Sequence, residues 1–168
     1  YRFNVFYESL TKALLQFHEE GTPIVLQGEL VGPKFNGNLY ELSEIYLVIF
    51  GVFLIEPSSI LDVEDPKYTL SSRRRVNYSE LKKWCERIAE ITKDPRILPV
   101  QRVLSGESFS YTLHELLNLA TMPLSKMYGL PFEPLEEGFH EGIVVRSPDK
   151  PNFSFKVVSN EYLLKKGH

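Results

Sequence analysis

The chain has little cysteine and no long apolar run. Cys85 is the single cysteine among 168 residues, so no disulfide can form within the chain. This favours a reducing compartment and predicts a cytoplasmic or otherwise intracellular protein. The longest apolar run, Ile45 to Ile55, has 11 residues, whereas a helix that crosses a membrane needs about 20. We therefore do not expect this run to span a bilayer.

Positive charge is not in excess either. The net charge is −3 and the pI is about 5.9, whereas dedicated nucleic-acid-binding domains are usually strongly basic. Any nucleic-acid contact must then rest on a local patch. The run Arg73, Arg74 and Arg75 is one candidate for gripping a phosphate backbone. A solvated cluster in a loop is an equally good interpretation of the same run.

The remaining composition is that of an ordinary globular domain. Hydrophobic residues make up 43% and charged residues 24% of the chain, and a chain of this length can bury a core without crosslinks. Internal repeats and low-complexity tracts are absent, which argues against a repeat architecture. We expect residues 1–168 to form one domain that lacks part of its N-terminal region.

Apolar spacing and capping signals predict helices and strands in irregular order. Helices are expected over residues 6–17, after the capping boxes that begin at Asn77 and Thr112, and from about Asn160. Strands are expected over 24–30, 45–55 and 97–104, and a hairpin over 141–146 and 153–158. Residues 56–76 are polar, contain two prolines, and are predicted to be a long loop. This order indicates an α+β fold rather than a regular βαβ array.

Three charged residues interrupt otherwise apolar strands, namely Glu29, Glu141 and Lys156. The simpler interpretation is that each faces solvent from a one-sided sheet, because buried charges are costly. However, Gly28 and Gly142 adjoin the two carboxylates, and a glycine lets a ligand approach the backbone closely. Carboxylates can hold ribose hydroxyls or hydrated Mg²⁺, a lysine can neutralise a phosphoryl group, and an aromatic ring can stack on a base. The set therefore suits a nucleotide site.

Four segments resemble, in order, the motifs of the covalent nucleotidyltransferases. Gly-Glu-Leu-Val-Gly-Pro at 28–33, followed by Asn38 and Tyr40, resembles motif III of RNA ligases, and Val-Ile-Phe-Gly-Val at 48–52 resembles motif IIIa. Glu-Gly-Ile-Val-Val-Arg at 141–146 resembles motif IV, and the segment 155–165 resembles motif V in its RNA ligase form. The chain is thus identified as a member of the ATP-dependent RNA ligase family, and the resemblance covers nearly its whole length.

The resemblance implies a fold, a reaction and its partners. The fold would be an ATP-grasp-like nucleotidyltransferase domain of antiparallel sheets flanked by helices. The enzyme would join RNA 3′-OH and 5′-phosphate ends, which could lie in a nicked duplex, through lysyl-AMP and adenylated-RNA intermediates in RNA repair. ATP would be the AMP donor, assisted by Mg²⁺ or Mn²⁺.

The resemblance also implies a role for each matching residue. Glu29 would hold the ribose hydroxyls, Phe50 would stack on adenine, and Gly28 would line the nucleotide site. Glu141 would bind the metal hydration shell or orient the nucleophile. Lys156 would contact the α-phosphate and stabilise the transition state.

The chain departs from the family pattern at three places. None of its lysines stands in the Lys-x-Asp-Gly motif that supplies the family's nucleophile, so no nucleophile can be assigned. Gly51 stands where motif IIIa often has Asp, and Val158 where motif V often has a second lysine. A degenerate homologue that binds nucleotide or RNA without chemistry is therefore an alternative. A DNA ligase or a GTP-using capping enzyme is another.

Overall fold

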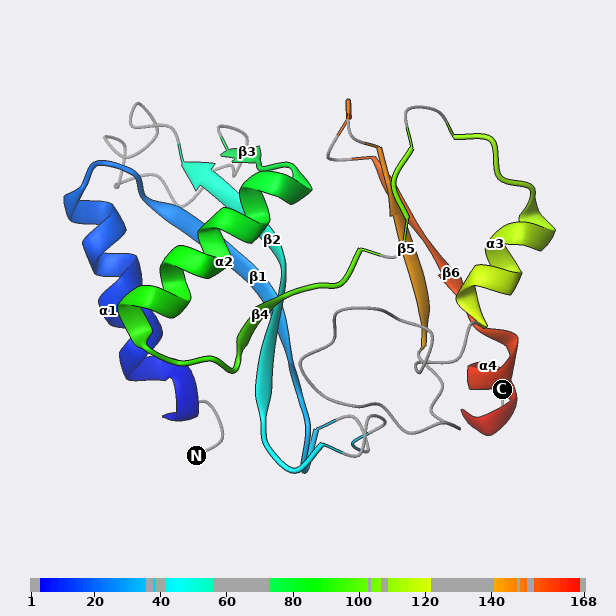
Figure 1. Cartoon of the computed structure of the whole chain (residues 1–168), viewed down its shortest axis with the longest axis horizontal. Coiled ribbons are helices and arrows are strands. Elements are labelled where there is room, and N and C mark those ends of the chain that lie inside the picture. The colour runs from blue at the N-terminus through cyan, green and yellow to red at the C-terminus, as the bar shows by residue number, and fades with distance from the viewer. Residues whose placement is uncertain are drawn as a thin grey trace, which may run out of the picture. The chain divides into compact units, whose positions relative to one another are not determined.

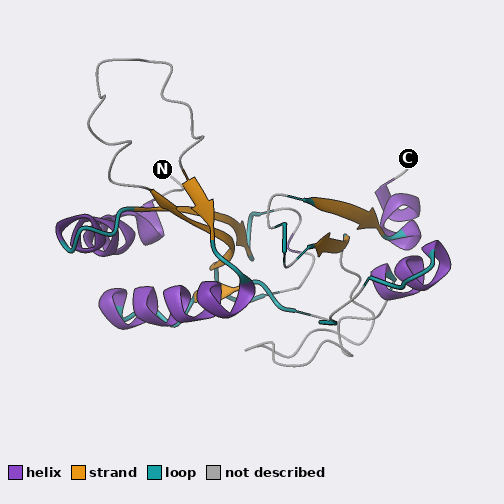
Figure 2. Ribbon diagram, turned by 90° about the horizontal axis from the view of Figure 1, so that it is seen from above, coloured by secondary structure: helices purple, strands orange, loops and turns teal. Residues whose placement is uncertain are grey.

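The structure is a computed structural model that describes residues 4–35, 38, 42–55, 73–102, 104–106, 109–121, 141–147, 149–150 and 153–166. It comprises two compact units (Figures 1 and 2). The first consists of Tyr1–Glu29 and Leu47–Pro99, and the second of Leu30–Tyr46 and Val100–His168. Each unit is described by itself below.

The first unit contains a mixed sheet and two helices. The helices are α1 (Asn4–Glu19) and α2 (Tyr78–Thr92), and the strands are β1 (Ile24–Val31), β2 (Tyr46–Ile55), β3 (Arg73–Arg75) and β4 (Ile97–Pro99). The order is β1-β2-β3, and β4 pairs in parallel with β2. Figure 1 shows α2 crossing in front of β1 and β2. The register places Leu54 opposite Arg74 and Val48 opposite Leu98.

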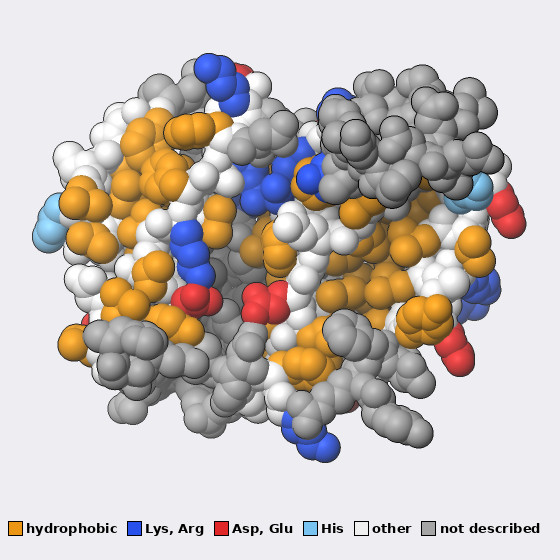
Figure 3. All heavy atoms as spheres, turned by 180° about the vertical axis from the view of Figure 1, so that it is seen from behind, with side chains coloured by type: hydrophobic (Ala, Val, Ile, Leu, Met, Phe, Trp, Pro, Cys, Tyr) orange, Lys and Arg blue, Asp and Glu red, His pale blue; other side chains and the backbone are white. Residues whose placement is uncertain are grey.

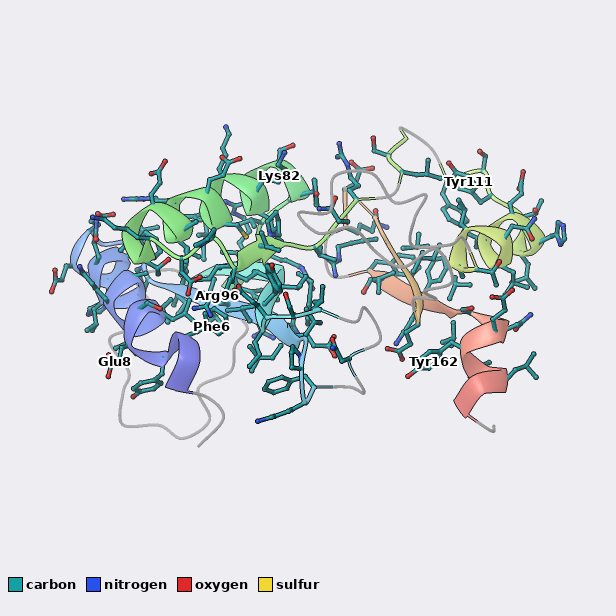
Figure 4. All side chains as sticks on the ribbon, turned by 60° about the horizontal axis from the view of Figure 1, so that its bottom comes forward. Phe6, Glu8, Lys82, Arg96, Tyr111 and Tyr162 are labelled. Carbon is teal, nitrogen blue, oxygen red and sulfur yellow. The ribbon has the colours of Figure 1, made fainter. Side chains whose placement is uncertain are left out.

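The core of this unit lies between the helices and the sheet. Apolar side chains from both helices and from β2 are fully buried, among them Phe17, Ile49, Val52, Leu81 and Ile88. The ring of Phe17 meets the Trp84 ring edge to face at 5.0 Å between centroids, so Trp84 is a packing residue of this core. Figure 4 shows Arg96 beside Phe6, with the guanidinium carbon 5.1 Å from the ring centroid.

The single cysteine belongs to this core. Cys85 is buried on α2, and burial raises the pKa of its thiol to about 12. The thiol therefore stays protonated at neutral pH and is a poor nucleophile. Cys85 acts as an inert packing residue, as its place on an apolar helix stripe predicts.

A complete capping box begins α2. The Asn77 side chain accepts a hydrogen bond from the Glu80 backbone N–H at 2.9 Å, and the Glu80 carboxylate accepts from the Asn77 backbone N–H at 2.9 Å. The Arg74 guanidinium also donates to Glu80, and these bonds hold the pKa of that carboxyl below its usual range, with Arg74 the larger cause.

We expect Asn77→Ala to lower the free energy of unfolding by about 1 kcal/mol, because the first turn of α2 loses its acceptor. Asn77→Asp keeps an acceptor and serves as the matched control. Urea unfolding followed by the fluorescence of Trp84, the single tryptophan, would measure both variants. Because the pKa of Glu80 is depressed, the box's contribution should be present at neutral pH and lost as pH falls through the carboxylate range. Equal stability of Asn77→Ala and wild type would contradict the assignment.

The second unit contains a hairpin covered by one helix. Its strands are β5 (Gly142–Arg146) and β6 (Ser154–Val158), which pair antiparallel with Val144 opposite Lys156. Helix α3 (Leu113–Ala120) begins with the second capping box, at Thr112 and Glu115. It packs Leu116 and Ala120 against Val157 of the hairpin. Helix α4 (Asn160–Lys166) follows β6 directly, as Figure 1 shows.

The α+β prediction is confirmed, and so are the helices and most of the strands. Two local predictions were wrong. Arg73–Arg75 is a strand and not part of a loop, because it pairs with Phe53–Ile55 of β2. The strand expected over 97–104 ends at Pro99, since proline has no N–H to continue a ladder. Most of the predicted loop, residues 56–72, lies outside the described residues. Among the helices that the structure describes, none has the length and apolar character needed to cross a membrane.

Candidate functional site

Two of the predicted site residues meet in the second unit. Glu141 immediately precedes β5, and Lys156 lies in the middle of β6. The Lys156 ammonium group forms an ion pair with Oε1 of Glu141. The side chain of Lys156 is 45% exposed and that of Glu141 is 47% exposed. An ion pair this accessible contributes less than about 1 kcal/mol to stability. The two charged groups are therefore paired at an accessible position.

Gly142 fixes the position of Glu141 relative to the hairpin. Its φ is +152°, and a Cβ at this residue would lie 2.1 Å from the Val157 carbonyl oxygen and 2.9 Å from Val158 Cα. Only glycine fits such a close approach in this conformation. The chain therefore enters β5 directly against β6, next to the strand that carries Lys156.

Ser159, which follows β6, links the start of α4 to the backbone of Glu141. Its backbone N–H donates to the Glu141 carbonyl at 2.9 Å, which extends the hairpin by one bond beyond Gly142. Its hydroxyl accepts from the Tyr162 N–H at 3.4 Å, and its carbonyl accepts from Leu163 at 3.1 Å, so Ser159 caps α4. Ser159 is completely buried. One buried residue thus ties the start of α4 to the backbone of Glu141, a contact that the sequence motifs did not indicate.

The ion pair can hold an anion or a hydrated cation. An ammonium group beside a carboxylate can turn to a phosphate oxygen while the carboxylate accepts from a water molecule or a hydroxyl. A single carboxylate suits a metal ion bound through water rather than a closed cage of protein ligands. Among the described residues, no group of three histidine, cysteine or acidic side chains could hold a metal ion.

The other predicted residues lie in the first unit. Gly28 and Glu29 are exposed on β1, and Phe50 is half-buried on the neighbouring strand β2. The exposure of Glu29 agrees with a charged residue on an accessible side of a sheet. A Cβ at Gly28 would lie 2.8 Å from the Val48 carbonyl oxygen. The close approach that requires glycine here is that of a neighbouring strand, and the approach of a ligand stays a prediction.

Arg75 contacts Phe50 from the adjacent strand. Its Nη2 donates to the Phe50 carbonyl at 2.8 Å, and its guanidinium carbon lies 5.1 Å from the centroid of the Phe53 ring. Arg73 covers the same ring at 4.6 Å. By contrast, Arg74 pairs with Glu80 at 3.2 Å and is more than half exposed. The three arginines therefore do not act as one solvated cluster.

Several other residues of interest have structural surroundings. Asn38, next to motif III, both donates to and accepts from the Leu42 backbone at 3.0 Å. On β5, burial lowers the pKa of the Arg146 guanidinium. Tyr40 lies outside the described residues. Figure 3 shows basic and acidic side chains beside apolar ones on the face in view.

Comparison with known proteins identifies the family. A family model described as RNA ligase matches residues 3–158. This match covers most of the sequence, so the chain belongs to the RNA ligase family. A search of curated proteins found no match.

Solved structures show the same fold. The chain is similar to an RNA ligase of Naegleria gruberi solved with PPi, at 20% identity and a TM-score of 0.63, over 98% of this chain and 40% of that one. A variant of that ligase with ATP and Mn matches at 21% identity and a TM-score of 0.65, over 98% and 39% of the two chains. A variant with AMP and Mn matches at 20% and 0.62, over 98% and 41%. The nucleotidyltransferase fold is thereby confirmed, and the chain spans about 40% of the length of these solved chains.

Proposed function

We propose that this chain is the nucleotide-binding core of an ATP-dependent RNA ligase that joins 3′-OH and 5′-phosphate RNA ends. The observation that carries the proposal is the exposed ion pair between Glu141 and Lys156, in a chain that matches the RNA ligase family over residues 3–158. The Naegleria gruberi ligase of the same fold has been solved with ATP, with AMP and with Mn, which supports ATP and a divalent cation as ligands.

Lys156 and Glu141 would act on the phosphate side of the nucleotide. In this role the Lys156 ammonium group leaves or shares its partner Glu141 and donates to an α-phosphate oxygen, where negative charge increases in the transition state. Because both side chains are nearly half exposed, this exchange needs no opening of a core. Glu141 would hold Mg²⁺ or Mn²⁺ through water, and the cation would offset phosphate charge when bound.

Glu29 and Phe50 would act on the nucleoside side. The exposed Glu29 carboxylate can accept hydrogen bonds from two ribose hydroxyls. The half-buried Phe50 ring can stack on adenine. Gly28 keeps β1 close against β2, so the strand that carries Glu29 runs directly beside the strand that carries Phe50.

The complete reaction needs a lysine that this chain does not supply in the expected motif. The family reaction would pass AMP from ATP to that lysine with release of pyrophosphate, then to an RNA 5′-phosphate with release of the lysine, and would end with attack by a 3′-OH that releases AMP. None of the 168 residues forms a Lys-x-Asp-Gly motif. We therefore propose that the described residues bind and orient ATP, and that the nucleophile comes from elsewhere in a longer protein.

The test is covalent labelling with α-labelled ATP in the presence of Mg²⁺ or Mn²⁺, read on a denaturing gel. We expect no label on this chain and a labelled band for a full-length protein that includes a Lys-x-Asp-Gly lysine. Competition by unlabelled ATP, and not by GTP, should remove that band. A labelled band from this chain alone would show that one of its own lysines is the nucleophile.

A second candidate function is nucleotide or RNA binding without chemistry. The missing nucleophile, together with Gly51 and Val158 at positions where the family often has Asp and Lys, favours it. A full-length protein that binds ATP but acquires no covalent label from α-labelled ATP would support this candidate against the ligase proposal.

A further inference from the structure

Arg75 on β3 donates a hydrogen bond to the backbone of Phe50 on β2. Strand β3 pairs with Phe53–Ile55 of β2, and the Arg75 side chain extends beyond these paired residues to the Phe50 carbonyl, to which its Nη2 donates at 2.8 Å. Arg75 therefore links the backbone of Phe50 to strand β3.

Arg75 is held in this place by its own surroundings. Its backbone pairs with Phe53 across the strands, and its guanidinium lies over the Phe53 ring. A planar guanidinium on an aromatic face, with one N–H directed at a carbonyl, has little freedom to turn. Arg75 can thus transmit the position of β3 to the backbone of Phe50.

Gly51 makes room for this contact. A Cβ at residue 51 would lie 2.9 Å from Nη2 of Arg75 and 3.1 Å from Oε1 of Gln27. The first distance is too short for real atoms, and the end of the arginine side chain would have to move. Nη2 is the same atom that donates to Phe50, so a side chain at position 51 would displace the donor.

We propose that Arg75 is a positioning residue for base recognition, which sets the Phe50 ring through the Phe50 carbonyl, and that Gly51 is the residue that permits it. This inference rests on the proposed function, in which Phe50 stacks on adenine. Arg75 lies outside all four segments that resemble RNA ligase motifs. Arg75 acts through Phe50, and its loss should weaken recognition of the base and leave phosphate binding unchanged.

The first test compares two probes, ATP and inorganic tripolyphosphate, by calorimetric titration into the chain. We expect Arg75→Ala to weaken ATP about tenfold, in the range of a lost stacking contact, and to leave tripolyphosphate unchanged. Arg75→Lys should recover part of the ATP affinity. Arg74→Ala is the matched control, because it removes the same charge from the next residue, which pairs with Glu80 and lies opposite Leu54 of β2. It should leave both affinities unchanged.

The second test is a double-mutant cycle. Gly51→Ala alone should weaken ATP about as much as Arg75→Ala, and should have little further effect when Arg75 is already alanine, since coupled residues are not additive. Trp84 fluorescence would confirm that each variant folds. If Arg75→Ala does not fold, Arg75→Lys and Gly51→Ala make the same comparison between the two probes.

Equal losses for ATP and tripolyphosphate in Arg75→Ala would overturn the proposal, because they would mean that Arg75 binds phosphate directly. Unchanged ATP affinity in that variant, or a full Gly51→Ala effect in the Arg75→Ala background, would overturn it as well. A wild-type chain that binds no ATP would instead refute the proposed function, and the positioning role with it.

Discussion

Lys156→Ala should lower the RNA-sealing rate of a full-length protein that contains this chain by about 100-fold or more, the usual loss when a preorganised charge is removed from a transition state. The reason is the place of the ammonium group. It is held on β6 by an ion pair with Glu141, and it is accessible enough to reach a phosphate. Single-turnover sealing of a 5′-phosphorylated RNA would measure the change.

Lys150→Ala provides the control for this experiment. Lys150 is exposed and precedes β6, and the hydrogen bonds that involve it, from its N–H to Ser147 Oγ and from Phe153 N–H to its carbonyl, use backbone atoms. Removing this lysine changes the net charge by the same amount and should leave the rate within about twofold of wild type, as for most surface substitutions. If Lys156→Ala sealed as fast as Lys150→Ala, the role given to Lys156 would be wrong.

Gly142→Ala should have the largest effect on the structure of the second unit. A Cβ there would lie 2.1 Å from the Val157 carbonyl oxygen, a backbone atom that cannot move alone, and φ is +152°. We expect a loss of about 3 kcal/mol or more in hairpin stability, the range for a residue that breaks special backbone geometry. Amide hydrogen exchange of β5 and β6, read by mass spectrometry, would show it as faster exchange at Val157 and Val158.

Gly21→Ala separates steric overlap from conformational strain. Gly21 also has a positive φ, +74°, but nothing lies within 4 Å of a Cβ at that position. Its substitution should cost only about 1–2 kcal/mol, the strain of a left-handed residue that is not glycine. A Gly142→Ala variant whose hairpin exchanges no faster than wild type would contradict the packing described for Glu141 and Lys156.

The sequence was a good guide where local chemistry determines structure. The capping boxes at Asn77 and Thr112 are confirmed atom by atom, because they depend on residues three positions apart. The strands that carry Glu29, Phe50 and Lys156 were also predicted correctly, since apolar residues occupy most of their positions. The family resemblance was confirmed by the match to RNA ligases.

Features that depend on tertiary pairing could not be predicted. Arg73–Arg75 has the composition of a solvated loop, and it forms a strand because it pairs with Phe53–Ile55 of β2. The role of Arg75 at Phe50 follows from that pairing, since the two residues are 25 positions apart. The ion pair of Glu141 with Lys156 likewise depends on the hairpin register, which residue type alone does not specify.

The most direct test of the account is a calorimetric titration of ATP, and separately of GTP, into the 168-residue chain with Mg²⁺, repeated with Glu29→Ala. We expect saturable binding of ATP that is tighter than binding of GTP and is weakened about tenfold or more by Glu29→Ala, as when a ribose loses its charged acceptor. Absence of saturable ATP binding, or ATP binding that Glu29→Ala leaves unchanged, would contradict the nucleotide site proposed for this chain.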